Sequence, residues 1–225
     1  MKQETLIWTR AKHPNIHTFL GFRVASEPQL IGPWCKNGNL SDYLVFNPQL
    51  STYDKLRLIH QSALGLTYLH NLLPPICHGD IKPENILIND SGEAAISDFG
   101  LSRVIESLEV HTGLTTSGGT KGTFVYCAPE LAVGLEDRPT CESDVYSFGG
   151  LTLSVMSGEV PYHGIKSAGV ILKRIMEGKV PQPSDHKAIP GNDTLWSLMR
   201  NCWKNEASDR PSMRDVITEV CTVSD

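Results

Sequence analysis

The most regular hydrophobic pattern in the chain runs through residues 51–70. Ser51 is the first residue of this stretch, and Asp54 lies three residues after Ser51, which is the spacing of a helix capping box. The apolar side chains recur at steps of three and four residues, as on one face of an α-helix: Leu56, Ile59, Ala63, Leu66 and Leu69. The pattern predicts a helix with one buried face that begins after Ser51 and ends near His70.

Shorter apolar runs predict most of the remaining elements. We expect two strands and four further helices, the strands over 16–24 and 28–34 and the helices over 3–12, 167–177, 193–204 and 213–221. His13 and Pro14 end the first helix, because a residue before proline avoids the helical region. Ser212, with Asp215 three residues later, predicts a capping box for the last helix.

The pattern of residues 85–98 is typical of a β-hairpin. An apolar run at 86–88 ends at four turn formers, N-D-S-G at 89–92, and a second apolar run follows at 94–96. A turn centred between residues 91 and 92 would place Asn85 opposite Asp98, with their Cα atoms roughly 5 Å apart. Two oxygen-bearing side chains at one end of a hairpin can share a hard cation such as Mg²⁺. With Asp80 on the loop before them, these side chains favour phosphoryl transfer.

Composition excludes several classes of protein. The 225 residues are 40% hydrophobic and 20% charged, which is ordinary for a globular chain, and the net charge of −5 offers no basic footprint for nucleic acid. No run reaches 18 apolar residues, and the first residues do not begin a signal peptide. The six cysteines contain no C-x-x-C pair, so we expect reduced thiols and a cytoplasmic protein.

Five motifs along the chain resemble those of protein kinases. Residues 77–88 read C-H-G-D-I-K-P-E-N-I-L-I and residues 98–100 read D-F-G, similar to the kinase catalytic loop and D-F-G motif. Residues 122–130 resemble the G-T-x-x-Y-x-A-P-E of serine/threonine kinases, and residues 143–149 and 209–211 resemble the S-D-V-Y-S-F-G and D-R-P motifs. The sequences H-P-N-I at residues 13–16 and I-K-P-E-N at residues 81–85 resemble most the tyrosine-kinase-like group of serine/threonine kinases.

The resemblance implies an α+β fold with the two lobes of a protein kinase. Residues 1–40 would form a partial, truncated N-lobe, and residues 41–225 a complete and mainly helical C-lobe. Asp80 would accept the proton of a serine or threonine hydroxyl on a protein substrate, and Lys82 would neutralise charge on the transferred phosphoryl group. Asn85 and Asp98 would hold Mg²⁺. The implied cofactors are ATP and Mg²⁺, and the implied partner is a protein substrate, with no nucleic acid and no membrane span.

The resemblance also implies a place for the adenine of ATP. The Pro33 carbonyl and the Cys35 N–H would bond to it, Leu87 would lie beneath it, and Gly32 would be the gatekeeper. Glu4 matches the helix glutamate that pairs with a lysine on the preceding strand in this family.

Two structural contacts are implied as well. Asp144 would hold the backbone of the catalytic loop, and Glu130 would pair with Arg210.

The chain departs from the family pattern in three features. It contains neither a G-x-G-x-x-G loop nor the strand lysine that would pair with Glu4. Gly79 replaces the arginine that grips a phosphorylated activation loop, so we expect no activation through a phosphate bound at this position. Residues 111–120 are rich in hydroxyls and are candidate phosphorylation sites in a loop.

Two other functions stay open at this point. A kinase-like module that binds without catalysing is one of them, because the chain lacks these two nucleotide-binding features. A small-molecule phosphotransferase is the other, because H-G-D-x-x-x-x-N also occurs there. Those enzymes lack the motifs matched at 122–130, 143–149 and 209–211.

Overall fold

The computed structural model describes residues 11–23, 29–98, 123–132, 134, 136 and 138–224, and within them the fold is mainly helical. The α-helices are α2 (Leu40–Phe46), α3 (Thr52–His70), α5 (Pro129–Ala132), α6 (Cys141–Ser157), α7 (Ala168–Met176), α8 (Leu195–Cys202) and α9 (Met213–Ser224). Short 3-10 helices are η1 (Pro83–Asn85), η2 (Thr123–Tyr126) and η3 (Ala207–Asp209). The strands form two antiparallel pairs, β1 (Gly21–Arg23) with β2 (Gln29–Ile31), and β3 (Ile86–Ile88) with β4 (Ala94–Ile96).

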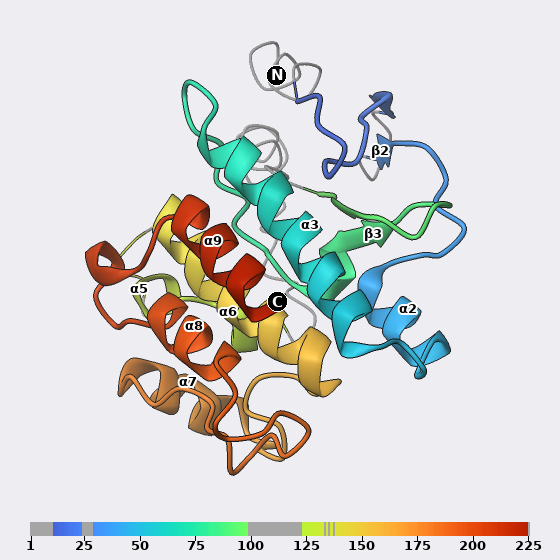
Figure 1. Cartoon of the computed structure of the whole chain (residues 1–225). Coiled ribbons are helices and arrows are strands. Elements are labelled where there is room, and N and C mark those ends of the chain that lie inside the picture. The colour runs from blue at the N-terminus through green and yellow to red at the C-terminus, as the bar shows by residue number, and fades with distance from the viewer. Residues whose placement is uncertain are drawn as a thin grey trace.

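Helix α3 lies at the centre of the fold, as the hydrophobic pattern predicts. The Ser51 side chain accepts a hydrogen bond from the Asp54 N–H, and the Asp54 carboxylate accepts one from the Ser51 N–H, which confirms the capping box. All five apolar residues of the predicted stripe are buried. The stripe packs against α9, α6 and β4, and α9 runs alongside α3 in Figure 1.

Helix α6 is the most deeply buried helix of the described chain. Every residue from 143 to 155 is buried, so this helix is surrounded by protein on all sides. Thr140 and Ser143 form its capping box, and Gly158 ends it in the left-handed conformation, with φ of 74°. Helix α6 packs against α3 on one side and against α8 on another, so it connects these two helices within the core (Figure 1).

The predicted register of the β3–β4 hairpin is wrong by one residue. Ile86 pairs with Ile96, so Asn85 lies opposite Ser97 instead of Asp98. The cause is the turn, in which the Asn89 side-chain oxygen accepts the backbone N–H groups of residues 91 and 93, and Gly92 is left-handed, with φ of 77°. A left-handed glycine completes a three-residue hairpin loop, and this moves the turn centre to residue 91.

Two segments before α2 flank this hairpin. Ile16 forms a parallel bridge with Ile96 of β4, and Asn39 forms an antiparallel bridge with Leu87 of β3. The predicted strands over 16–24 and 28–34 are confirmed as the shorter pair β1–β2, whereas the predicted helix over 3–12 lies almost entirely outside the described residues. None of the helices in the described ranges has both the length and the apolar character needed to cross a membrane.

Candidate active site

The catalytic-loop residues Asp80, Lys82 and Asn85 are in direct contact. The Lys82 ammonium lies 2.7 Å from Oδ2 of Asp80, and Nδ2 of Asn85 donates to the same oxygen at 2.8 Å. Asn85 also donates to the backbone carbonyl of Asp80 at 2.7 Å, which fixes the loop between them. The η1 turn makes this approach possible, because it folds residues 83–85 back toward Asp80. The carboxylate keeps 36% of its side-chain surface exposed, so a substrate can reach it.

Asp144 of α6 anchors the backbone of this loop, as the resemblance implies. Its two carboxylate oxygens accept the N–H groups of His78 at 2.7 Å and Gly79 at 2.8 Å. Nε2 of His70, the last residue of α3, donates to the same carboxylate at 2.9 Å. Three donors satisfy a carboxylate that is only 1% exposed, and a buried charge without such partners would be costly.

The His70 imidazole carries the positive charge that balances this buried carboxylate. Burial by itself lowers the pKa of His70, but its hydrogen bonds with Asp144 and Cys141 outweigh burial and raise the pKa to about 9. At neutral pH the imidazole is therefore protonated. The loop is thus held to α6 by a charged group that comes from the end of α3.

His78 connects the catalytic loop to the end of β4. Its Nε2 atom lies 2.8 Å from the Ser97 carbonyl, and its Nδ1 atom lies 3.2 Å from the Asp80 N–H. A carbonyl can only accept and a backbone N–H can only donate, so Nε2 carries the proton. The H-G-D motif contains this buried histidine, but no local pattern in the sequence predicts its contact with Ser97. The His78 ring therefore holds the backbone of Asp80 at a fixed position relative to Ser97, the residue that precedes Asp98.

Asp98 lies one residue beyond the hairpin pairing. Ser97 donates both its N–H and its hydroxyl to the Asn85 carbonyl, at 2.9 and 3.0 Å, and Asp98 follows directly. Asp98 is exposed and has a φ of 57°, a left-handed conformation that few non-glycine residues adopt. The β-ladder therefore ends before Asp98. Asn85 and Asp98 sit at the same end of the hairpin without being cross-strand partners.

The segment expected to bind adenine is attached to the β3–β4 hairpin. Cys35 is half-buried and Pro33 is exposed. The next residue, Lys36, donates its N–H to Asp90 at 3.1 Å and forms an ion pair with the same carboxylate. Leu87 is half-buried and lies beside this segment through its bridge to residue 39. The residues predicted on the two sides of an adenine thus come from neighbouring stretches of backbone.

The gatekeeper position is not open, although it is a glycine. A Cβ atom on Gly32 would lie 2.3 Å from Nε2 of His17, so the imidazole ring occupies the space that a gatekeeper side chain would fill. The ring also lies 3.9 Å from the Cys35 sulfur. Burial lowers the pKa of His17, and the charge of Asp98 partly offsets this effect. His17 therefore lies beside Gly32 and Cys35 and within electrostatic range of Asp98, an arrangement that no local pattern in the sequence predicted.

Arg210 secures the segment that follows η2. Its guanidinium forms two hydrogen bonds with the Glu130 carboxylate, at 2.6 and 2.8 Å, which confirms the implied pair. Its other N–H groups donate to three backbone carbonyls, so all five donors are used. Burial first, and then the charges of Glu130 and Asp80, raise the pKa of Cys127 to about 11. The anchored segment is therefore within electrostatic range of Asp80.

Gly79 is required by the conformation of the loop. Its φ is 82°, and a Cβ atom there would lie 2.6 Å from the Pro139 ring. A glycine fits this site because it has no side chain and adopts positive φ at little cost. The expectation that activation does not depend on a phosphate bound at this position stays a prediction. Glu4, Phe99, Gly100 and the hydroxyl-rich residues 111–120 lie outside the described residues.

The helical fold and the contacts of the catalytic loop point to one class of protein, the protein kinases. A family model of protein tyrosine and serine/threonine kinases matches residues 1–220, and the chain belongs to this family.

Several curated relatives are themselves protein kinases. Receptor-interacting serine/threonine-protein kinase 3 of Rattus norvegicus is 32% identical over 225 residues, which cover 96% of this chain and 47% of that protein. Receptor-interacting serine/threonine-protein kinase 2 of Bos taurus is 28% identical over 228 residues, covering 97% of this chain and 42% of that protein. The leucine-rich repeat receptor protein kinase MSP1 of Oryza sativa subsp. japonica is 32% identical over 228 residues, covering 92% of this chain and 17% of that protein. The chain spans less than half the length of each of these relatives.

Proposed function

We propose that this chain is a serine/threonine protein kinase domain that transfers the γ-phosphoryl group of ATP to hydroxyl groups of proteins. The observation that carries the proposal is the contact of the Lys82 ammonium and the Asn85 amide with one carboxylate oxygen of Asp80, at 2.7 and 2.8 Å. Two relatives are named serine/threonine-protein kinases, and this supports a hydroxyl of serine or threonine as the acceptor.

Asp80 is the proposed proton acceptor. Lys82 and Asn85 hold its Oδ2 atom, which orients the carboxylate so that its second oxygen can face a substrate hydroxyl. As the hydroxyl oxygen bonds to the γ-phosphorus, its proton passes to Asp80, and the bond from phosphorus to the β-phosphate oxygen breaks to release ADP. The Lys82 ammonium stabilises negative charge on the transferred group. Positioning and electrostatics of this kind supply most of the rate of such transfers.

Asn85 and Asp98 are the proposed magnesium ligands. The Asn85 amide nitrogen donates to Asp80, so the amide oxygen is its donor atom for a cation, and Asp98 offers an exposed carboxylate. Mg²⁺ commonly takes one or two protein oxygens and completes its coordination with phosphates and water. When bound, Mg²⁺ would neutralise charge on the ATP phosphates. These oxygen donors fit that requirement.

In this proposal the nucleotide lies between residues 1–40 and residues 41–225. The Pro33 carbonyl and the Cys35 N–H bond to adenine, and Leu87 packs beneath it. The bridge between residue 39 and Leu87 supports this placement, because it holds Leu87 beside the backbone that follows residues 33–35. Glu4 is proposed as the counterpart of the helix glutamate of this family, whose strand lysine is absent from this sequence.

A phosphoryl-transfer assay with radiolabelled Mg-ATP and a generic protein substrate tests the proposal. Replacing Asp80→Asn removes the proton acceptor and keeps the side-chain shape, so the rate should fall about 100- to 10,000-fold. Asp185→Asn is the matched control, because Asp185 is an exposed acid in the loop between α7 and α8 and should leave the rate unchanged. Equal transfer by the chain and by its Asp80→Asn variant would overturn the catalytic proposal.

A thermal-shift measurement with Mg-ATP separates this proposal from the binding-module alternative. A shift together with Asp80-dependent transfer supports the kinase. A shift without transfer identifies a nucleotide-binding module, and the absence of both identifies a kinase-like scaffold. Transfer to an aminoglycoside or choline, with none to protein, would identify a small-molecule phosphotransferase.

A further inference from the structure

Two cysteines that are distant in sequence meet beside the catalytic loop. The sulfur atoms of Cys77 and Cys141 lie 3.7 Å apart, although 64 positions separate the residues. Cys77 immediately precedes His78 of the H-G-D motif, and Cys141 is the first residue of α6. Both side chains are half-buried and both are thiols in this structure. A disulfide requires a sulfur separation of about 2.05 Å, so a closure of less than about 2 Å shared by two side chains would join them.

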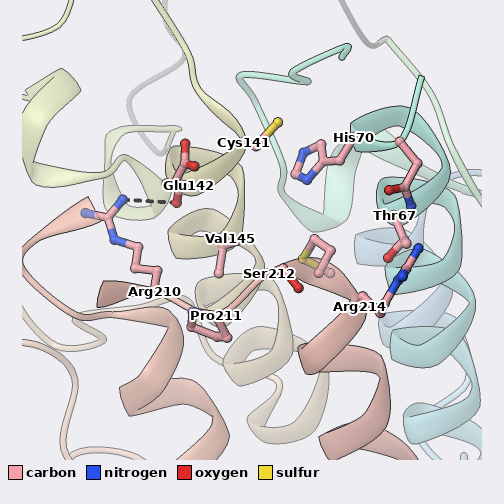
Figure 2. A pocket seen from close by; sticks show the side chains of 11 residues that line it. Thr67, His70, Cys141, Glu142, Val145, Arg210, Pro211, Ser212 and Arg214 are labelled. Atoms are coloured by element: carbon pink, nitrogen blue, oxygen red, sulfur yellow. Dashed lines mark hydrogen bonds between the residues drawn. The ribbon is translucent and has the colours of Figure 1, made fainter. Parts of the chain in front are cut away.

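The surroundings of Cys141 favour its reaction with an oxidant. His70 lies beside Cys141, and its interaction with the Cys141 side chain is one of the causes that raise the pKa of His70. Cys141 and His70 also line a cavity of about 440 Å³ between α3, α6 and α9. Figure 2 shows the two side chains next to each other at one end of this cavity. A small oxidant in this cavity therefore meets Cys141 beside the imidazole of His70.

We infer that Cys77 and Cys141 form a reversible redox pair, which a hydroperoxide such as hydrogen peroxide converts to a disulfide. The Cys141 thiolate attacks the peroxide, so a sulfur–oxygen bond forms, the oxygen–oxygen bond breaks, and the departing hydroxide takes up a proton to leave as water. The Cys77 thiol then attacks the resulting sulfenic sulfur. The sulfur–sulfur bond forms, and the hydroxyl leaves with the Cys77 proton as a second water. The two thiols lose two hydrogen atoms, and one peroxide is reduced to two waters.

The position of the pair gives the oxidation a defined consequence. The N–H groups of His78 and Gly79 are already held by Asp144, which lies three residues after Cys141 on α6. A disulfide would add a covalent link between the same two segments, immediately before the loop that carries Asp80. The oxidation requires no kinase activity, so it can be tested independently of the proposed function.

Mass spectrometry of the peroxide-treated chain tests this inference. We expect the intact mass to fall by two hydrogen atoms, the mass to be restored by dithiothreitol, and non-reducing peptide mapping to join the peptides that contain Cys77 and Cys141. The cross-link closes a long loop, so the melting temperature should rise by about 5–10 °C. A cross-link between other cysteines, or addition of oxygen to Cys141 in the intact chain without a cross-link, would overturn the inference.

Single substitutions assign the roles of the two sulfurs. Cys141→Ser should abolish the cross-link, and Cys77→Ser should leave a Cys141 sulfenic acid that dimedone traps. Cys127→Ser is the matched control and should retain the cross-link, because this half-buried thiol lies in a different segment and its pKa is raised to about 11. His70→Asn should slow the oxidation of Cys141. Unchanged cross-linking in either Cys77→Ser or Cys141→Ser would refute the pairing.

Discussion

Raising the pH from about 6 to about 9.5 should destabilise this chain through one histidine. His70 lies at the end of α3 with 10% of its side chain exposed, and Nε2 donates to the buried carboxylate of Asp144 at 2.9 Å. The pKa of His70 is about 9 in the folded chain and 6.5 for an ordinary histidine. A group whose pKa is raised on folding stabilises the folded state when it is protonated. The contribution is therefore fully present below pH 6.5 and is lost as the pH rises through 9.

The magnitude follows from the rise in the pKa of His70 from 6.5 to about 9. At about 1.4 kcal/mol per pH unit, the charged imidazole contributes about 3 kcal/mol to the free energy of unfolding. The side chain is nearly buried, so solvent screens little of this amount. A domain of this size has a total stability of roughly 5–15 kcal/mol. Loss of this one charge should therefore lower the unfolding midpoint visibly.

Urea unfolding at several pH values between about 6 and 9.5 measures this effect, with His70→Asn as the reference. The variant keeps a side-chain N–H for Asp144 and carries no charge. Its free energy of unfolding should therefore be lower than that of the unchanged chain at pH 6, and this gap between the two chains should shrink as the pH rises to about 9.5. The difference between the two chains cancels the other titrating groups, among them His17 and His186, whose pKa values burial lowers. Parallel profiles for the chain and the variant would refute the assigned charge of His70.

Two further substitutions test the packing of the fold by chemical denaturation. Gly65→Ala should lower the free energy of unfolding by about 1–3 kcal/mol, because its Cβ atom would lie 2.3 Å from the backbone oxygen of Asn15. Gly169→Ala is its matched control, with nothing closer than 4.0 Å, and should leave stability equal or higher; equal effects of the two changes would contradict this packing. Arg210→Lys should lower the free energy of unfolding by about 2–4 kcal/mol. The five guanidinium N–H groups donate to Glu130 and to nearby carbonyls, and a lysine ammonium has only three donors to replace them. An unchanged denaturation midpoint in the lysine variant would argue against this network.

The elements that the sequence predicted well depend on neighbouring residues. Helix α3 begins after Ser51 because the side chain and backbone of Ser51 bond to Asp54, three positions away, and one helical turn brings them together. The last helix begins in the same way, with Ser212 and Asp215 bonded to each other. Caps and stripes of this kind are local, so a linear pattern contains them.

The hairpin register shows where a local pattern is insufficient. The turn formers at 89–92 were recognised, but two turns that differ by one residue fit the same letters. The left-handed Gly92 and the two hydrogen bonds to the Asn89 side chain favour the longer turn. As a result, Ser97 faces Asn85, and Asp98 falls beyond the ladder.

The sequence by itself determined the kinase family, the main helices and the short catalytic loop, because these depend on residues within a few positions of one another. Only the tertiary structure decided that His70 balances Asp144, that His17 fills the space beside Gly32, and that two thiols meet before the H-G-D motif. The first and last of these contacts join residues 74 and 64 positions apart. They exist because the buried stripe of α3 packs against α6, and burial of apolar surface brings together polar groups that no local pattern relates.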